Sequence, residues 1–286
     1  MPSRLLVADG NTAQGRAEYR LVGGTEMGEG YARLLRELMP EGVVDVCYPA
    51  DPGACLPGGA GLDSYDGLAI SGSSLNIYDG GPAIMPQIEL VRAALAAGVP
   101  IFGSCWGLQV LTVAAGGVVR RNPRGREIGF GRRIHLTSAG SDHPMFRDKT
   151  KLFDAVTVHL DEVATLAPGM TVLATNHHST VQAAEIRTNL GIAWGVQYHP
   201  ELSLTDLAII MRRYGLRLVE EGFFARAEAL DVFTVELEAL DRDPADRALA
   251  WRHGVDTAVL DRRLRVKELD NWLTSQVQRR NQRRHV

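Results

Sequence analysis

The sequence has few cysteines and no long apolar run. Three of its 286 residues are cysteine (Cys47, Cys55 and Cys105), and this odd number forms no even disulfide framework, which fits a reducing cytosol. No apolar run approaches the roughly 18 residues that a membrane-spanning helix requires. The first residues, MPSRLLVADG, become polar too soon for a secretory signal peptide and are typical of a first strand. These absences predict a cytoplasmic protein without a membrane segment.

Neither sign of charge dominates the chain, but the charge is unevenly distributed. The formal net charge is −3, whereas residues 261–286 hold eight Lys and Arg against three acidic residues, which leaves −8 elsewhere. The same region has apolar positions at helical spacing, namely Val266, Leu269, Leu273 and Val277. This helix is expected to pack on its own domain, or else to dock a partner or a second copy of the chain. Nucleic-acid binding is the least favoured role, because the remainder is acidic and contains no recognised binding module.

Residues 99–115, VPIFGSCWGLQVLTVAA, have the most distinctive pattern in the chain. An apolar run bounded by Gly98 and Gly103 predicts a buried strand, and an apolar helix follows the segment GSCWG. The pattern G-x-C-x-G is the cysteine form of a nucleophile elbow, a strained turn that presents its middle side chain above a sheet. At the amino end of a helix, unpaired N–H groups favour the thiolate of Cys105. The alternative interpretation is a small buried apolar residue.

A second apolar strand, WGVQYHPE over residues 194–201, also ends in a polar cluster. A cysteine nucleophile requires a base that takes its proton, and the base requires a third group that fixes its tautomer. His199 is the candidate base, and Glu201 is the candidate carboxylate that orients the imidazole. Pro200 restricts the backbone between them.

The segments GSCWGLQ and GVQYHPE, about ninety residues apart and in this order, resemble the class I, triad-type glutamine amidotransferases. A stand-alone member similar to the amidotransferase part of GMP synthase is expected. The resemblance implies an α/β fold of the flavodoxin-like amidotransferase type, with a doubly wound, mostly parallel sheet. It covers residues 1–221 and predicts a family domain there, followed by a helical C-terminal extension over residues 222–286.

The resemblance also implies further site residues. The backbone N–H groups of Ser73 and Trp106 would form an oxyanion hole, although Ser73 stands where the family has a second glycine, and serine tolerates a positive φ poorly. Gly72 and Gln109 would contact the substrate, Gln109 through its side-chain amide. His159 lies in a stretch that loosely matches a family loop whose backbone touches bound glutamine.

Two further stretches carry weaker signals. Residues 12–26 form a polar, glycine-containing stretch that is longer than the family pattern, so we expect an inserted loop that either covers the active site or is passive. The adjacent residues His177 and His178 raise the question of a metal site. In a strand they would point to opposite faces, and no nearby cysteine or carboxylate spacing completes a zinc set, so no metal is predicted.

These residues predict an enzyme that needs no cofactor. Cys105 would attack the γ-amide carbon of glutamine, and a γ-glutamyl thioester would then be hydrolysed with help from His199. No G-x-x-x-x-G-K-[ST] motif is present, and 65 residues after Glu221 are too few for an ATP-cleaving synthetase domain. The first hypothesis is therefore an amidotransferase that supplies ammonia to a separate synthetase. The alternative is a partner-free hydrolase of γ-glutamyl amides or peptides, and a non-catalytic binding module is disfavoured because all three triad residues are present.

Overall fold

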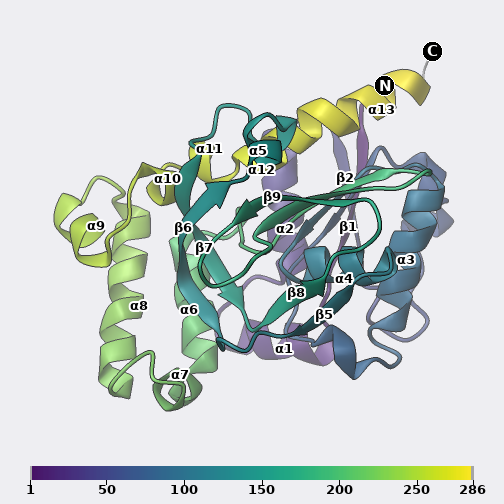
Figure 1. Cartoon of the computed structure of the whole chain (residues 1–286). Coiled ribbons are helices and arrows are strands. Elements are labelled where there is room, and N and C mark those ends of the chain that lie inside the picture. Colours follow the sequence, from purple (N-terminus) through teal and green to yellow (C-terminus); the bar gives the residue numbers. More distant parts are fainter. Residues whose placement is uncertain (1, 285–286) are drawn as a thin grey trace.

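A nine-stranded mixed sheet forms the centre of the molecule in the computed structural model, which describes residues 2–284 (Figure 1). The strand order is β2-β1-β3-β4-β11-β10-β9-β6-β7. Neighbours from β2 to β11 pair in parallel, and those from β11 to β7 pair antiparallel. The strands are β1 (Arg4–Ala8), β2 (Val43–Cys47), β3 (Gly67–Ile70), β4 (Ile101–Ser104), β6 (Glu127–Leu136), β7 (Leu152–His159), β9 (Met170–Thr175), β10 (Ala183–Arg187) and β11 (Ile192–Val196), with β5 (Val118–Arg121) and β8 (Asp161–Thr165) in a separate two-stranded sheet.

Both faces of the parallel half are covered by helices, which confirms the predicted doubly wound α/β class. Successive side chains of a strand point to opposite faces. In β1, Leu6 and Ala8 join a core with α3 (Met85–Ala96) and α4 (Trp106–Ala114), whereas Leu5 and Val7 join a second core with α2 (Met27–Leu38). The strands of this half are therefore almost continuously apolar, as buried parallel strands are.

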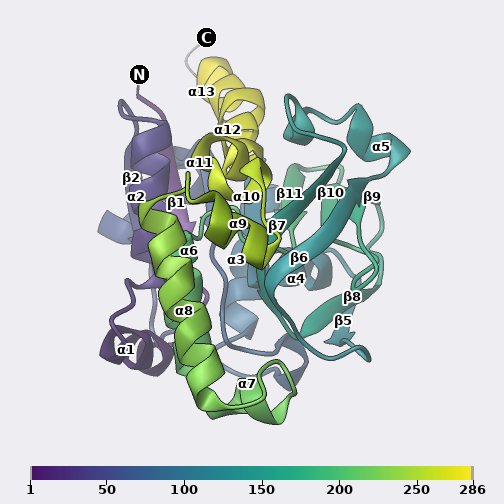
Figure 2. The same ribbon diagram turned by 90° about the vertical axis from the view of Figure 1, so that its left-hand side faces the viewer.

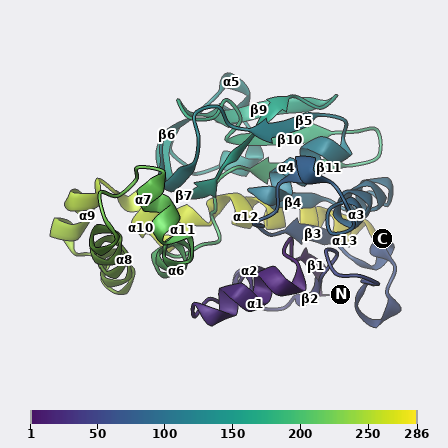
Figure 3. The same ribbon diagram turned by 90° about the horizontal axis from the view of Figure 1, so that it is seen from below.

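The C-terminal residues complete the second of these cores. The chain there forms α12 (Lys267–Trp272), a π-helical turn (Leu273–Val277) and α13 (Gln278–Arg284). Figure 3 shows α12 and α13 beside β3 and β4, and the Trp272 ring lies 5.9 Å from that of Phe102 on β4. All four positions of the predicted apolar stripe are buried in the core that contains this sheet face. This helical face lies against the chain's own sheet.

Part of the positive charge near the C-terminus is also used within the chain. Arg280 donates to the backbone carbonyls of Tyr65, Ala97 and Gly98, and Arg284 forms an ion pair of 2.8 Å with Asp66. These contacts join the last helix to the end of the sheet where β3 and β4 begin.

A third core joins the remaining helices to the antiparallel half of the sheet. The long helix α8 runs alongside α6, and both pack near β7 (Figure 2). The helices of this region are α6 (Leu204–Tyr214), α7 (Leu216–Glu220), α8 (Ala227–Arg242), α9 (Arg247–His253), α10 (Thr257–Leu260) and α11 (Arg262–Arg265); the four-residue α5 (Ser138–Ser141) contacts β9. Within residues 2–284, no helix combines the length and apolar character needed to span a bilayer.

The expected loop over residues 12–26 is wrong, because most of it forms helix α1 (Ala13–Leu21). Thr12 caps this helix by accepting a hydrogen bond of 3.1 Å from Gly15 N. Arg16 anchors it through a 2.5 Å ion pair with Asp51 and a 2.7 Å hydrogen bond to Asn11 O. The next helix, α2, begins at Met27. A partner 35 residues away stabilises α1, and no local pattern in the sequence reveals such a partner.

Candidate active site

Cys105 occupies a strained turn between β4 and α4. Its backbone has φ 51° and ψ −100°, and its N–H donates to Val196 O at 2.7 Å, across to the neighbouring strand β11. The flanking glycines permit this geometry. A Cβ at Gly103 would lie 2.4 Å from Gly107 C, and one at Gly107 would lie 2.7 Å from Ile70 O. The turn therefore places the thiol at the carboxyl edge of the parallel strands, where ligands of such sheets bind.

The structure brings His199 and Glu201 to the same place as Cys105. The His199 ring donates from Nδ1 to Glu201 Oε1 at 2.7 Å, and both side chains are 5% exposed. This bond fixes the tautomer and leaves Nε2 for the thiol. The backbone N–H of His199 donates to Val156 O at 2.8 Å, and the Cys105 thiol donates to Val158 O at 3.4 Å. Strand β7 thus contacts the backbone of His199 and the side chain of Cys105.

The electrostatics of the site favour a charged imidazole. Burial opposes the charge on His199, but the Glu201 carboxylate, the charge of Cys105 and hydrogen bonds to both raise the pKa of His199 to about 10. Opposite charges within a few ångströms favour the ionised form in this way. These interactions favour the imidazolium form of His199 at neutral pH.

The loop after β3 lies directly against His199. A Cβ at Gly72 would lie 2.7 Å from His199 Cε1, so only glycine fits under the ring. Asn11 holds this loop by donating from Nδ2 to Gly72 O at 3.1 Å. Ser73 has no positive φ, and its hydroxyl donates to Gly10 O at 2.8 Å. Serine in place of the second glycine therefore introduces no backbone strain.

At the site, the backbone N–H groups of Ser73 and Trp106 have no acceptor within residues 2–284. Trp106 is the first residue of α4, where helix geometry supplies no partner. The Trp106 ring is fixed by a 2.7 Å hydrogen bond from Nε1 to Gln87 Oε1, and Gln87 Nε2 donates to Gly10 O at 3.2 Å. Because the Ser73 hydroxyl donates to the same Gly10 O, these bonds tie the loops after β1 and β3 to the turn that carries Cys105.

Gln109 and His159, the two other residues predicted to contact the substrate, differ in what their side chains contact. Gln109 is 3% exposed and lines a pocket of about 110 Å³ together with Cys105 and His159. The His159 ring is directed into the protein, where Nε2 lies 2.8 Å from Glu127 Oε2 and Nδ1 lies 2.9 Å from Asp161 O. Its ring therefore belongs to a buried polar network.

His177 and His178 lie in the loop after β9 rather than in a strand. His177 is exposed, while the ring of His178 lies 5.7 Å from that of His159 and 3.2 Å from Gly125 O. In the part of the chain that the structure describes, no three His, Cys, Asp or Glu side chains are grouped so as to hold a metal ion.

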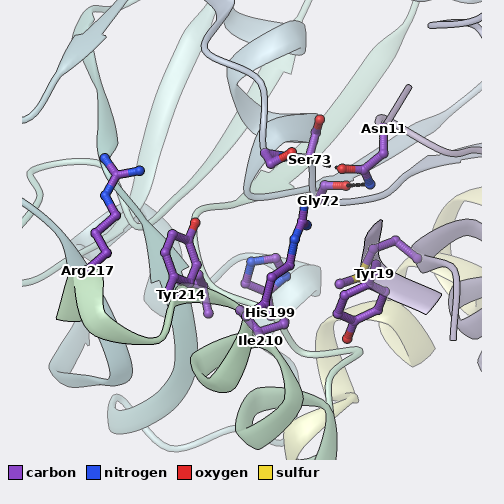
Figure 4. A pocket seen from close by; sticks show the side chains of 12 residues that line it. Asn11, Tyr19, Gly72, Ser73, His199, Ile210, Tyr214 and Arg217 are labelled. Atoms are coloured by element: carbon purple, nitrogen blue, oxygen red, sulfur yellow. Dashed lines mark hydrogen bonds between the residues drawn. The ribbon is translucent and has the colours of Figure 1, made fainter. Parts of the chain in front are cut away.

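A larger pocket of about 300 Å³ opens on the His199 side of the site (Figure 4). Tyr19 of α1, Met27 of α2 and Ile210 of α6 line it, and in the view of Figure 4 His199 lies between Tyr19 and Tyr214. The sequence motifs identified none of these lining residues. The only signal for Asn11, which also lines the pocket, was its place just after β1, at the edge where ligands bind.

Known proteins of similar sequence cover nearly the whole chain. Residues 49–213 match the family glutamine amidotransferase class-I. The chain is 37% identical to a γ-glutamyl-L-1-hydroxyisopropylamide hydrolase of Pseudomonas sp, over 94% of this chain and 92% of that protein. It is 30% identical to γ-glutamyl peptidase 5 of Arabidopsis thaliana, over 61% of this chain and 69% of that protein.

Other relatives are larger proteins or share mainly the fold. A glutamine-hydrolysing GMP synthase of Thermus thermophilus is 30% identical over 80% of this chain, but the match spans only 42% of that protein. A solved glutamine amidotransferase from Thermotoga maritima superposes with a TM-score of 0.61 at 19% identity, covering 97% of this chain and 99% of that one. The family match covers more than half of the chain, and the chain belongs to the class I glutamine amidotransferase family.

Proposed function

We propose that this protein hydrolyses γ-glutamyl amides through a Cys105–His199–Glu201 triad, without a partner enzyme. The observation that carries the proposal is the buried His199–Glu201 pair beside a thiol on a strained turn. An activated nucleophile, a base and a group that orients the base are the three components of this chemistry.

In the first step, the Cys105 thiolate attacks the γ-carbonyl carbon of the substrate. A carbon–sulfur bond forms, and the carbonyl oxygen takes the negative charge. The unpaired N–H groups of Ser73 and Trp106 are the proposed donors to this oxyanion. Fixed donors of this kind typically contribute about 3–4 kcal/mol each to transition-state stabilisation.

In the following steps, the carbon–nitrogen bond breaks as His199 donates its proton to the departing amine. The products are the amine and a γ-glutamyl thioester on Cys105. Water then attacks the thioester carbon while His199 takes a proton from it, which releases glutamate and restores the thiolate. Glu201 stabilises the imidazolium in both proton transfers.

The acyl half of the substrate would occupy the small pocket beside Cys105. We propose that the Gln109 side chain bonds the polar groups of the glutamyl moiety, since it lines this pocket and is nearly buried. His159 would contribute its backbone, because its ring is engaged with Glu127. Gly72 would serve by leaving room for His199.

The partner-free reaction has better support than ammonia supply to a synthetase. The hydrolase relative matches over 94% of this chain and 92% of its own length, so it has no additional large domain. The GMP synthases support the second candidate, an amidotransferase that acts on a separate acceptor, but this chain spans less than half of their length. More than half of each of those proteins therefore lies outside the match.

Steady-state assays of the purified chain alone test this proposal. We expect turnover of at least one γ-glutamyl alkylamide with a kcat/KM at least about tenfold above that for glutamine, since a partner-free hydrolase has its complete site. Cys105→Ala is the control for contaminating activity. Turnover of glutamine alone, or activity only after a synthetase is added, would favour the amidotransferase.

A further inference from the structure

Two adjacent pockets lie at the candidate triad. The smaller pocket, of about 110 Å³, is lined by Cys105 and Gln109, and the larger, of about 300 Å³, is lined by His199. Val158 and Tyr214 line both pockets, so the two lie side by side, with the nucleophile in one and the base in the other.

The chemistry assigns one half of the substrate to each pocket. The acyl group becomes bonded to the Cys105 sulfur, so the glutamyl half lies on the cysteine side. The amine nitrogen receives its proton from His199, so it lies on the histidine side. Any substituent on that nitrogen therefore projects into the larger pocket.

The volume on the histidine side far exceeds what ammonia requires. A water molecule occupies about 30 Å³ in the liquid, and ammonia is of similar size, so the pocket of about 300 Å³ has room for roughly ten such molecules. A substituted amine with several non-hydrogen atoms fits this space.

The lining also has a definite chemical character. Tyr19, Met27 and Ile210 contribute a ring, a thioether and a branched aliphatic chain. Among the described residues, no carboxylate lines this pocket. Arg213 lines it too, and pairs with Glu18 at 2.8 Å. A second ammonium group on the amine would find no counter-ion here and would meet a guanidinium instead.

We infer that this space, the amine pocket lined by Tyr19, Met27 and Ile210, binds the amine half of the substrate and selects uncharged primary alkylamines. The inference rests on the proposed function and specifies its substrate class as γ-glutamyl amides of such amines. Helix α1 and the start of α2 thereby become specificity elements, since they supply Tyr19 and Met27.

Substitution at Met27 tests the pocket directly. Met27 is partly buried, and the larger ring of Met27→Trp would fill space that an alkyl substituent needs but ammonia does not. We expect the ratio of kcat/KM for γ-glutamyl-n-butylamide to that for glutamine to fall about tenfold or more, as steric discrimination in a pocket does. Met85→Trp is the matched control, because Met85 is 47% exposed on α3 and lines no part of this pocket.

Two further measurements keep the inference open to contradiction if Met27→Trp folds poorly. Met27→Ala should raise the same ratio for a bulkier amide such as γ-glutamylcyclohexylamide, and the wild type should cleave the n-butylamide at least about tenfold faster than the amide of 1,4-diaminobutane. Equal ratios in the wild type and both variants, or faster cleavage of the diamine derivative, would overturn the amine pocket. Absence of turnover of every γ-glutamyl amide by the wild type would instead contradict the proposed function.

Discussion

Tyr198 and His199 are neighbours in the sequence, and the side chain of each donates a hydrogen bond to a glutamate. The two glutamates lie far apart from each other in the sequence. His199 donates to Glu201, two residues further on. Tyr198 donates to Glu268, which lies 70 residues away on α12 and is fully buried. The first contact lies within this short segment, where His199 lines the larger pocket, and the second contact joins the segment to the C-terminal helices.

The difference lies in what else each glutamate contacts. Glu201 contacts the His199 imidazole, which lines the amine pocket. Its charge raises the pKa of this ring, the group that we propose transfers protons. Glu268 contacts Lys149 at 2.5 Å, and Tyr198 and Lys149 are themselves buried. Burial lowers the pKa of Lys149, and the adjacent Glu268 carboxylate opposes this effect. We therefore assign Glu201 to the chemistry and Glu268 to the stability of the segment that carries the triad.

The match with one relative includes most of the C-terminal helices that carry Glu268, as a structural role for them requires. Only 6% of this chain lies outside the match with the Pseudomonas hydrolase, so most of residues 222–286 is shared with that relative. We propose the boundary at residue 221 as the end of the family's common region, with the extension folded onto it as one unit.

Removing the nucleophile should affect chemistry without affecting stability. Cys105→Ala should lower kcat/KM by at least about 10⁴-fold, because the remaining groups act as a unit with the thiol. Urea unfolding should give a free energy close to that of the wild type. Residual activity within tenfold of the wild type would contradict the triad.

Removing the second glutamate's charge should have the opposite pattern. Glu268→Gln leaves Lys149 buried without a counter-charge, and such losses cost about 3–5 kcal/mol of unfolding free energy. Where the variant is folded, its kcat should remain close to that of the wild type. Equilibrium unfolding in urea measures the difference.

Two variants control this experiment. The double variant Lys149→Met/Glu268→Leu should be less destabilised than Glu268→Gln, because neither residue then carries a buried unpaired charge. Glu89→Gln, at an exposed pair with Arg92, should change stability by less than about 1 kcal/mol. A Glu268→Gln protein as stable as Glu89→Gln would refute the anchoring role.

Replacing the first glutamate should change the pH dependence more than the stability. The pKa of His199 is raised to about 10, so wild-type activity should persist through neutral pH and fall only as this group loses its proton at alkaline pH. Glu201→Gln removes the stabilising charge, lowers that pKa and should move the alkaline limb of kcat down by about 1–3 pH units. The accompanying loss in kcat/KM should be about 10²-fold. Superimposable pH profiles would show that Glu201 does not act on His199.

The sequence predicted one of these glutamates and missed the function of the other. Glu201 follows a histidine in a motif, whereas Glu268 resembles any acidic residue in a basic amphipathic helix. Its burial depends on Lys149 and Tyr198, which are distant in the sequence. The periodicity of the C-terminal stripe did predict an apolar face correctly, because the spacing that places apolar residues on one face of a helix is a local feature of the sequence.

In the fold and the candidate site as well, features that depend on local patterns could be predicted, whereas features that depend on distant residues could not. Apolar runs predicted the buried strands β4 and β11, and short motifs brought Cys105, His199 and Glu201 into consideration together. Helix α1 was missed, because a distant ion pair to Asp51 anchors it. The amine pocket was missed too, since Tyr19, Met27 and Ile210 come from three helices and meet only in the folded chain.

Trapping of the acyl-enzyme tests the central claim most directly. The wild-type protein is mixed with a γ-glutamyl alkylamide, quenched in acid within milliseconds to seconds, digested and analysed by mass spectrometry. The account predicts a γ-glutamyl adduct on the peptide that contains Cys105, formed together with a burst of free amine. The buried Cys47, whose pKa is raised to about 12 by burial and Asp9, and the exposed Cys55 should carry none. Turnover without any adduct at Cys105, or an adduct at another residue, would contradict it.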